Sequence, residues 1–455
     1  MYSDGTVAAL STPYGRGAIA MIRITGADAH KITAAVFRPK SGRAYSDIPA
    51  AKAVYGEFTY DGSVIDDGVM TLYRAPVSYT GEDMAELCCH GGMLVSSLVL
   101  KALFEAGAAP AAGGEFTKRA FVNGKLRLTS AEAIMDIIDA ESVGALKLAG
   151  ANNRGLLSAE TERMYGELKH LIAQTYAYID YPDEDMTDIS VSELRDRIAA
   201  LLSDADRLKD SYRTASAVCA GVKTVICGSP NVGKSSLLNA LTGEDTAIVT
   251  EIPGTTRDIV TGSVTIGDVK LRLADTAGIR ETSDTVERIG VQRAREAVEG
   301  AELVLPVFDG SREPSGEERE FISYLQSSGK AVIAVINKTD LGLCGGYDGL
   351  FEKSVRISAK SGEGLGELKD MIRDAFICGG IDYSAPHLIN ARQYSAVLRF
   401  ADSLGRALSA LDAGQTQDLA CLDLEEALSE IAGLDGLEIK DDITDEIFSK
   451  FCVGK

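Results

Sequence analysis

The stretch Lys223–Leu241 reads KTVICGSPNVGKSSLLNAL and decides the fold of the segment around it. Its first residues form a short apolar run typical of a buried strand, and its last residues are typical of a helix. Between them, Gly228 to Ser235 match the pattern G-x-x-x-x-G-K-S. In this context the pattern predicts a loop that binds phosphates, because the glycines let the backbone approach them closely and the helix N-terminus faces them.

Each residue type in this loop has a chemical reason for its place. Gly228 and Gly233 allow the backbone to turn with its amides pointing inward. Lys234 can reach the β- and γ-phosphates of a nucleotide, and the Ser235 hydroxyl can ligate Mg²⁺. The residues of the loop that we expect to bind the nucleotide are Asn231, Val232, Gly233, Lys234, Ser235 and Ser236.

Two further motifs follow in the order that such a domain requires. GTTRD (Gly254–Asp258) contains a threonine that can complete the Mg²⁺ sphere in the triphosphate state. DTAG closes the apolar run VKLRLA, where Asp275 can hold the Mg²⁺ shell and the amide of Gly278 can sense the γ-phosphate. The expected nucleotide-binding residues of this motif are Asp275, Thr276, Ala277 and Gly278.

The choice of base is predicted by NKTD, which follows the apolar run AVIAVI. The carboxylate of Asp340 can accept hydrogen bonds from both N1–H and the 2-amino group of guanine, a donor pair that adenine lacks. The base-binding residues that we expect are Asn337, Lys338 and Asp340, supported by Ser358, Ala359 and Lys360 after the next strand. Five elements in order predict a GTP-binding domain over residues 218–378.

Hydrolysis in this domain cannot follow the common glutamine mechanism. Ras-like enzymes position the attacking water with a glutamine directly after D-x-x-G. That position is Ile279 here, and its side chain can neither orient nor polarise water. The residues alone leave three candidates for this role in the following segment, Glu281, Asp284 and Glu287.

Composition places these motifs in a larger protein. At 455 residues the chain is too long for one core. Net charge is −21, whereas residues 1–120 hold 11 basic and 12 acidic residues, so an RNA contact is expected from the N-terminal third or from a partner.

Eight cysteines without CxxC pairs predict a reducing compartment. The sequence offers neither a long apolar run nor a leader, so we expect a cytoplasmic location without membrane contact.

The predicted secondary structure changes at three places along the chain. Residues 1–120 predict an α+β domain, and residues 121–217 and 379–455 predict helices on both sides of the 218–378 segment. Leu194, Ile198, Leu201, Ala205, Leu208 and Tyr212 form an apolar stripe at helical spacing. The economical hypothesis is a single helical domain split by the insertion; the alternative is two separate bundles.

With these motifs the chain resembles the TrmE (MnmE) family of tRNA-modification GTPases. The resemblance rests on GSPNVGKSS, GTTRD, DTAGIRET with VERIG, NKTD and the last four residues, Cys452-Val453-Gly454-Lys455. The N-terminal stretches TPYGRGAIAMIRITG, TGEDMAELCCHGG and GEFTKRAFVNGKLRLTSAEAIMDII are similar to the family's folate-domain signatures. Val453 stands where isoleucine or leucine is common, which is a conservative difference.

For the GTPase domain, the resemblance implies dimerisation across the switch regions with K⁺ beside the phosphates. The charge of K⁺ would replace an arginine finger. The implied K⁺ ligands are Asn231, Thr250, Ile252 and Thr255, the implied Mg²⁺ ligands are Ser235 and Thr256, and the implied catalytic glutamate is Glu287. The whole loop expected around the nucleotide is Thr250, Glu251, Ile252, Pro253, Gly254, Thr255 and Thr256.

For the N-terminal domain, the resemblance implies an aminomethyltransferase-like fold that binds 5-formyl- or methylene-tetrahydrofolate. A pterin needs a carboxylate for its N3–H and 2-amino edge, and the glutamate tail of a folate needs a cation. The residues that match the family's folate ligands are Arg23, Glu86, Lys125 and Lys455. Glu82 is a rival to Glu86. The pattern places Cys452 toward the pterin, in a chemical or a packing role.

Taken together, the resemblance implies a homodimer that forms a heterotetramer with an FAD-dependent MnmG (GidA)-type subunit. That complex would add an aminomethyl or carboxymethylaminomethyl group to C5 of the wobble uridine U34 of certain tRNAs. Folate would supply the one-carbon unit, and GTP hydrolysis would move the GTPase domains. The rival hypothesis is an Era-like GTPase switch in ribosome or complex assembly, which shares the nucleotide motifs but lacks a folate domain and a terminal C-x-G-K.

Overall fold

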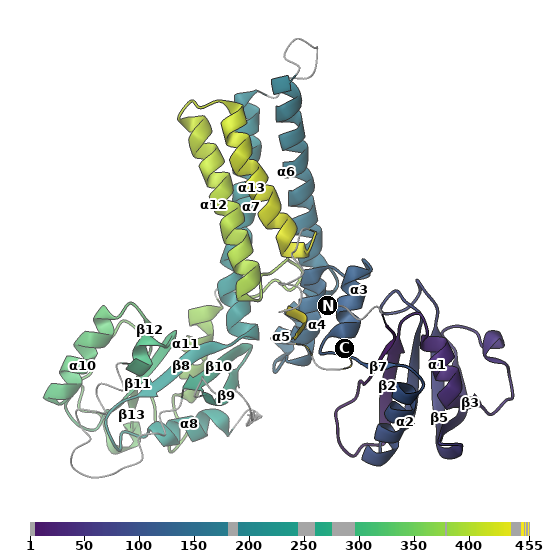
Figure 1. Cartoon of the computed structure of the whole chain (residues 1–455). Helices are drawn as coiled ribbons and strands as arrows, with labels where there is room; N and C mark the ends of the chain where they lie inside the picture. Colours follow the sequence, from purple (N-terminus) through teal and green to yellow (C-terminus); the bar gives the residue numbers. More distant parts are fainter. Residues whose placement is uncertain are drawn as a thin grey trace. The chain divides into compact units, whose positions relative to one another are not determined.

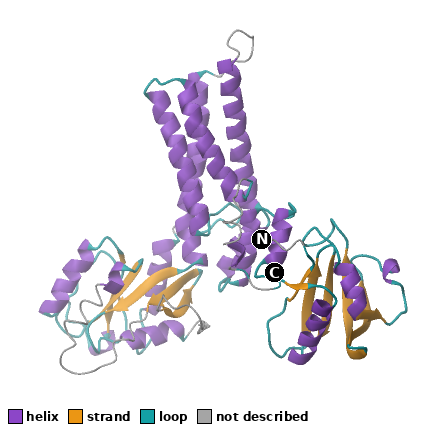
Figure 2. Cartoon of the chain, in the orientation of Figure 1, coloured by secondary structure: helices purple, strands orange, loops and turns teal. Residues whose placement is uncertain are grey.

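The structure is a computed structural model that describes residues 5–180, 190–243, 260–274, 296–377, 380–437, 447–449, 451 and 454. It has a multidomain α/β and α architecture (Figure 2). Contacts divide the chain into two compact units, one of residues 1–135 with 432–455 and one of residues 136–431. Among the described residues, no helix combines the length and the apolar character that crossing a membrane requires. The bounds expected for the four sequence segments stay predictions.

The first unit is built around a mixed sheet with the strand order β3-β4-β5-β6-β2-β1-β7. Figure 1 shows this sheet in purple. Helices α1 and α2 pack on the sheet and on each other, over a core that includes Ile22, Leu72 and Leu87. The strands are β1 (Val7–Leu10), β2 (Ile19–Thr25), β3 (Phe37–Pro39), β4 (Ala53–Tyr60), β5 (Ser63–Tyr73), β6 (Met84–His90) and β7 (Ala109–Pro110). The helices are α1 (Ala29–Val36), α2 (Met93–Glu105), α3 (Glu115–Val122) and the start of α4 (Leu128–Ile138).

The described C-terminal residues belong to this same unit. The Phe448 ring packs against Phe121 and Phe451, and all three join one apolar cluster with Leu128. The Ser11 hydroxyl donates a hydrogen bond of 2.9 Å to the carbonyl of Gly454. Tertiary packing therefore places the end of the chain beside the turn that follows β1.

Helices from both sides of the inserted segment pack together in the second unit, as the apolar stripe predicts (Figure 1). The stripe residues from Leu194 to Leu208 are buried on α7, and the ring of Tyr212 stacks on that of Tyr394 of α12 at 4.5 Å. Tyr176 of α6 donates a hydrogen bond to Glu425 of α13. The helices are α5 (Val143–Asn153), α6 (Leu156–Asp180), α7 (Val191–Cys219), α12 (Ala391–Asp412) and α13 (Gln417–Asp435).

The inserted segment forms the second sheet, with the strand order β14-β13-β11-β8-β10-β9 and β12 paired to β11. Its pairs are parallel except β9 with β10, so the carboxyl ends of β8, β11 and β13 share one edge. The strands are β8 (Val222–Cys227), β9 (Val260–Ile266), β10 (Val269–Ala274), β11 (Leu303–Asp309), β12 (Ala331–Val332), β13 (Ala334–Asn337) and β14 (Ser354–Arg356). The helices are α8 (Lys234–Thr242), α10 (Gly316–Ser327) and α11 (Leu365–Phe376).

Candidate nucleotide site

The loop between β8 and α8 has a backbone that two glycines make possible. Gly228 has a φ of 142°, and a Cβ there would lie 2.2 Å from the carbonyl oxygen of Val307 in β11. Gly233 has a φ of 101°, and a Cβ there would lie 2.2 Å from Nδ2 of Asn337. Both approaches are open only to glycine. The backbone of the loop therefore lies in close contact with β11 and β13, and α8 begins at Lys234.

The Lys234 ammonium lies inside this loop. Its Nζ donates hydrogen bonds of 2.9 Å to the carbonyls of Gly228 and Ser229. Burial lowers the pKa of Lys234, since a low dielectric disfavours the charged form. An ammonium that is desolvated and bound to carbonyl oxygens is well suited to exchange these partners for phosphate oxygens.

Asn337, at the end of β13, joins this loop to the segment after β14. Its Nδ2 donates to the carbonyl of Val232 at 2.8 Å, and its Oδ1 accepts from the amide of Ala359 at 2.9 Å. The side chain is buried, with both ends of the amide satisfied. The structure therefore brings the expected phosphate loop and the expected base-supporting segment together through one side chain.

The carboxylate expected to read guanine is held from the same segment. The Ser358 hydroxyl donates to Oδ1 of Asp340 at 2.8 Å, in the short 3-10 helix η2 (Thr339–Leu341). Lys338 takes the left-handed conformation, with a φ of 67°, and its Nζ lies 2.6 Å from Oδ2 of Asp309. Lys360 directly follows Ala359 and leads into the loop before α11. The residues expected to bind and to support the base thus lie at one edge of the sheet.

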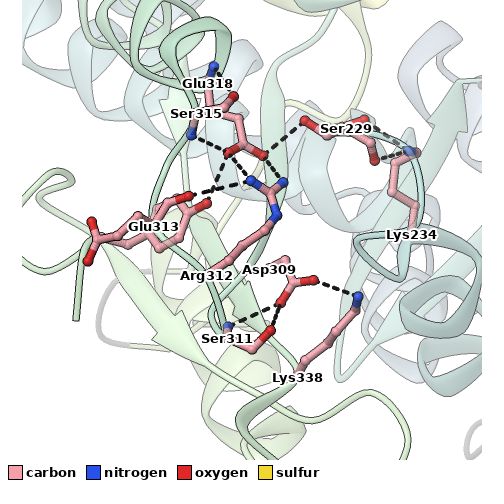
Figure 3. Close-up of polar contacts among 11 residues, drawn as sticks. Ser229, Lys234, Asp309, Ser311, Arg312, Glu313, Ser315, Glu318 and Lys338 are labelled. Atoms are coloured by element: carbon pink, nitrogen blue, oxygen red, sulfur yellow. Dashed lines mark hydrogen bonds and ion pairs between the residues drawn. The ribbon is translucent and has the colours of Figure 1, made fainter. Parts of the chain in front are cut away.

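Several polar residues of this region were missed by the sequence reasoning. Asp309 ends β11, and although burial raises its pKa, hydrogen bonds from Lys338 and Ser311 outweigh this and lower it. Figure 3 shows Glu318 beside Ser229 and Arg312, three residues to which the motifs assign no role. One signal was available, because Ser315-x-x-Glu318 is a capping-box pattern, and the structure shows both of its hydrogen bonds.

Many of the expected residues lie outside the described part of the chain. They are Thr250, Glu251, Ile252, Pro253, Gly254, Thr255, Thr256, Asp275, Thr276, Ala277, Gly278, Glu281, Asp284, Glu287, Cys452 and Lys455. Of the loop residues that are described, Asn231, Ser235 and Ser236 are exposed. Asn231 has a φ of 62°, a conformation that asparagine tolerates better than most residues.

In the first unit, Arg23 and Glu86 face each other across the β2–β6 pair. Nε of Arg23 lies 2.9 Å from Oε1 of Glu86, and the Tyr73 hydroxyl donates to Oε2 of Glu86 at 3.2 Å. The Arg23 guanidinium also lies over the ring of Tyr79, 5.6 Å from its centre. Lys125 donates to the carbonyl of Pro76, which lies with Tyr79 in the loop between β5 and β6.

Glu82, the rival to Glu86, has different partners. Its Oε2 accepts from Nη1 of Arg119 at 3.0 Å and from the hydroxyl of Thr25 at 3.1 Å. Arg119 is 6% exposed and also pairs with Glu115 at 2.7 Å. Glu82 therefore pairs with the buried Arg119, whereas Glu86 pairs with Arg23, one of the other expected folate residues.

The fold and the site together define a class of protein. A glycine-bounded phosphate loop after β8, a base-reading element after β13 and a largely parallel sheet that aligns them are the features of a P-loop GTPase.

Comparison with known proteins identifies the family. A family model described as the MnmE helical domain matches residues 128–452, and one described as the GTP-binding protein TrmE N-terminus matches residues 6–125. The tRNA modification GTPase MnmE of Symbiobacterium thermophilum is 40% identical, covering 99% of this chain and 100% of that one. The proteins of the same description from Natranaerobius thermophilus and Clostridioides difficile are 38% and 35% identical, each over 100% of both chains.

The chain belongs to the MnmE family of tRNA modification GTPases. Membership makes it a GTP hydrolase of tRNA modification and supports that hypothesis over the Era-like alternative.

Proposed function

We propose that the chain is a K⁺-dependent GTPase whose nucleotide lies along the edge formed by the ends of β8 and β13. The observation that supports this placement of the nucleotide is the bridge made by Asn337, which joins the loop of Lys234 to the segment of Ala359. Lys234 would exchange its carbonyl partners for phosphate oxygens, and Asp340, oriented by Ser358, would accept from the guanine edge.

Two metal ions fit the residues of this loop. Ser235 and Asn231 are exposed residues of the loop. The hydroxyl of Ser235 would ligate Mg²⁺, and the amide oxygen of Asn231 would ligate K⁺. Thr256 would complete the Mg²⁺ site, and the K⁺ site would also use Thr250, Ile252 and Thr255. The ions would supply positive charge as negative charge develops on the transferred phosphoryl group.

Within this frame, Glu287 would align the attacking water in place of the missing glutamine, acting through a bridging water. Exchanging Glu287 for alanine should lower kcat for GTP, because alanine cannot orient a water molecule, while leaving the Kd for GTP near that of the wild type. An unchanged kcat would remove Glu287 from this role.

The first unit would bind 5-formyl- or methylene-tetrahydrofolate, with Arg23, Glu86, Lys125 and Lys455 as ligands. The facing pair of Arg23 and Glu86 supports this assignment, because the pair supplies both a carboxylate and a cation at one place on the sheet. The contact of Gly454 with Ser11 supports the contribution of Lys455, its immediate neighbour. Cys452 would lie near the same ligand, in a chemical or a packing role.

The complete reaction would require partners. The chain would form a homodimer and a heterotetramer with an FAD-dependent MnmG (GidA)-type subunit, in the cytoplasm. Together they would modify C5 of the wobble uridine U34 of certain tRNAs, with the folate as one-carbon donor. The net charge of −21 supports a division of labour in which the partner provides most of the affinity for tRNA.

The folate assignment can be tested by ligand-dependent stability. Adding 5-formyltetrahydrofolate to the protein should raise its melting temperature, because a ligand that binds only the folded state stabilises it. Exchanging Glu86 for glutamine should reduce this rise. The absence of any rise at millimolar ligand would contradict the folate site.

The K⁺ assignment needs a separate measurement. GTP turnover should fall by an order of magnitude or more when K⁺ is replaced by Na⁺ at constant ionic strength, because Na⁺ is too small for the same ligands. Equal turnover in the two salts would remove K⁺ from the mechanism, and with it the role of Asn231.

A further inference from the structure

Glu318, in the first turn of α10, is a buried carboxylate with an unusually complete set of partners. Its side chain is 4% exposed. Oε1 accepts from the Ser229 hydroxyl at 2.9 Å and from Nη2 of Arg312 at 2.7 Å. Oε2 accepts from Nη1 of Arg312 at 3.0 Å, from the Ser315 amide at 2.9 Å and from the Tyr347 hydroxyl at 3.1 Å.

Helix capping does not account for this arrangement. A capping box requires only that Glu318 accept from the Ser315 amide, which one carboxylate oxygen at the surface can do. Burying the carboxylate carries a desolvation cost, which the bidentate pair with Arg312 offsets. Burial raises the pKa of Glu318, but the hydrogen bonds from Arg312, Ser315 and Ser229 outweigh it and lower the pKa, so the group is ionised at neutral pH.

The contact with Ser229 leads directly to the phosphate loop. The Ser229 hydroxyl donates to Glu318, while the Ser229 carbonyl accepts from Nζ of Lys234 at 2.9 Å. Figure 3 shows the chain of contacts that links Arg312 to Glu318, Glu318 to Ser229, and Ser229 to Lys234. Arg312 lies three residues after Asp309, which holds Lys338. The end of β11 and the turn after it are thus connected to the phosphate loop through Glu318 and to the base motif through Lys338.

We infer that Glu318, held by Arg312, is a positioning residue for GTP, acting through Ser229 on the phosphate loop. Its carboxylate holds the first side chain of the loop, so that the carbonyls that keep Lys234 in place stay in register with the site of the phosphates. The inference rests on the proposed assignment of Lys234 to the phosphates, and it adds a residue from a different helix to that site.

The test begins with Ser229 in the full-length protein. Ser229→Ala and Ser229→Val remove the hydroxyl, and Ser229→Thr keeps it. A hydrogen bond to a charged group contributes enough that its loss should raise the Kd for fluorescent GDP about 5- to 10-fold in the first two variants, with faster release. Ser229→Thr should bind within about twofold of the wild type, because the threonine hydroxyl can donate the same hydrogen bond to Glu318.

Ser323→Ala provides the matched control. Ser323 lies on the same helix, is exposed, and donates its hydroxyl to the Arg319 carbonyl at 3.0 Å. Its loss should leave GDP affinity unchanged. Wild-type affinity in Ser229→Ala, or an equal loss in Ser229→Thr, would overturn the inference.

A double-mutant cycle then separates positioning from a general loss of stability. Glu318→Gln should also weaken GDP binding, and adding Ser229→Ala to it should weaken binding little further, because the two residues act in series. Fully additive losses would show that Glu318 does not act through Ser229. If Glu318→Gln does not fold, the Ser229 variants decide alone.

A separate variant tests the proposed contact of Lys234 with the phosphates. Lys234→Ala should bind GDP far more weakly than any Ser229 variant. GDP affinity that survives in Lys234→Ala would refute the proposed phosphate site. Loss in Lys234→Ala with no effect in Ser229→Ala would refute only the role of Glu318.

Discussion

Asn337 contributes more to the site than its place in the base motif suggests. A side-chain amide carries donors at one end and an acceptor at the other, and here one donor and the acceptor are bound to different loops. Aspartate at this position would lack the donor for Val232, and leucine would lack both groups. The residue therefore links two segments that are more than a hundred residues apart in sequence.

At the residue scale, the specificity for guanine can be changed at Asp340. Asp340→Asn replaces one acceptor oxygen with a donor, so the contact with N1–H and the 2-amino group is lost. The affinity for GTP should fall by about 10²-fold or more, since a site built for hydrogen bonds rejects an unmatched partner strongly. The affinity for xanthosine triphosphate, which carries a carbonyl at C2, should rise.

Competition between the two nucleotides for a fluorescent analogue measures both changes. Asp348→Asn is a suitable control, because Asp348 pairs with Arg356 on the exposed surface of the same domain. A variant at Asp340 that keeps the wild-type preference for GTP would contradict the base assignment.

At the scale of elements, the end of β11 organises two motifs that the sequence presents as independent. Asp309 closes the strand and holds Lys338, and the turn that follows presents Arg312 to Glu318. The parallel pairing of β11 with both β8 and β13 makes this possible, because it brings the ends of the three strands to the same edge. A strand without a nucleotide motif thus positions the two that have one.

The Asp309–Lys338 pair predicts a pH dependence. The pKa of Asp309 is lower in the folded protein, so its contribution is fully present above the unfolded value of about 4 and is lost as pH falls through the folded value. At pH 7, Asp309→Asn should lower the free energy of opening of β11 and β13 by about 1 to 3 kcal/mol. The difference from the wild type should shrink only below about pH 4 to 5.

Hydrogen exchange at the amides of β11 and β13, measured from pH 7 down to about pH 2.5, gives these opening free energies. Asp382→Asn offers a comparison, because Asp382 is an exposed acid whose pKa is also lowered, mainly by Ser384, but which lies outside this sheet. A difference that stays constant down to about pH 2.5, or that is absent at pH 7, would be inconsistent with this role of Asp309.

At the scale of the whole molecule, helices that precede the GTPase segment pack against helices that follow it. The stacking of Tyr212 on Tyr394 and the hydrogen bond from Tyr176 to Glu425 join helices that precede the insertion to helices that follow it. Each of these amphipathic helices buries its apolar face on the others, so most of its stability depends on tertiary packing.

A fragment of residues 120–217 should accordingly be poorly helical alone, because α7 would expose the stripe that α12 covers. Adding a fragment of residues 379–455 should restore helicity, as measured by far-UV circular dichroism of the mixture and of its separate parts. A stably helical and monomeric 120–217 fragment would instead favour two separate bundles.

The sequence by itself predicted which residues would meet phosphate and base, because such contacts are made by short motifs at strand ends whose chemistry is local. It also determined the helical stripe from Leu194 to Leu208, because burial on a helix follows its period. It could not reveal Ser229, Arg312 and Glu318 as one cluster, since their contact depends on how α10 packs after β11. Nor could spacing separate Glu86 from Glu82.

Strand register and packing in the tertiary structure determine the partners of these residues. Register sets Arg23 opposite Glu86, while Arg119 of α3 binds Glu82. The same packing brings Gly454 to Ser11 across almost the whole length of the chain. The physical reason is that a motif is selected for the chemistry it performs on a ligand, whereas a supporting contact needs only two side chains that the fold brings together.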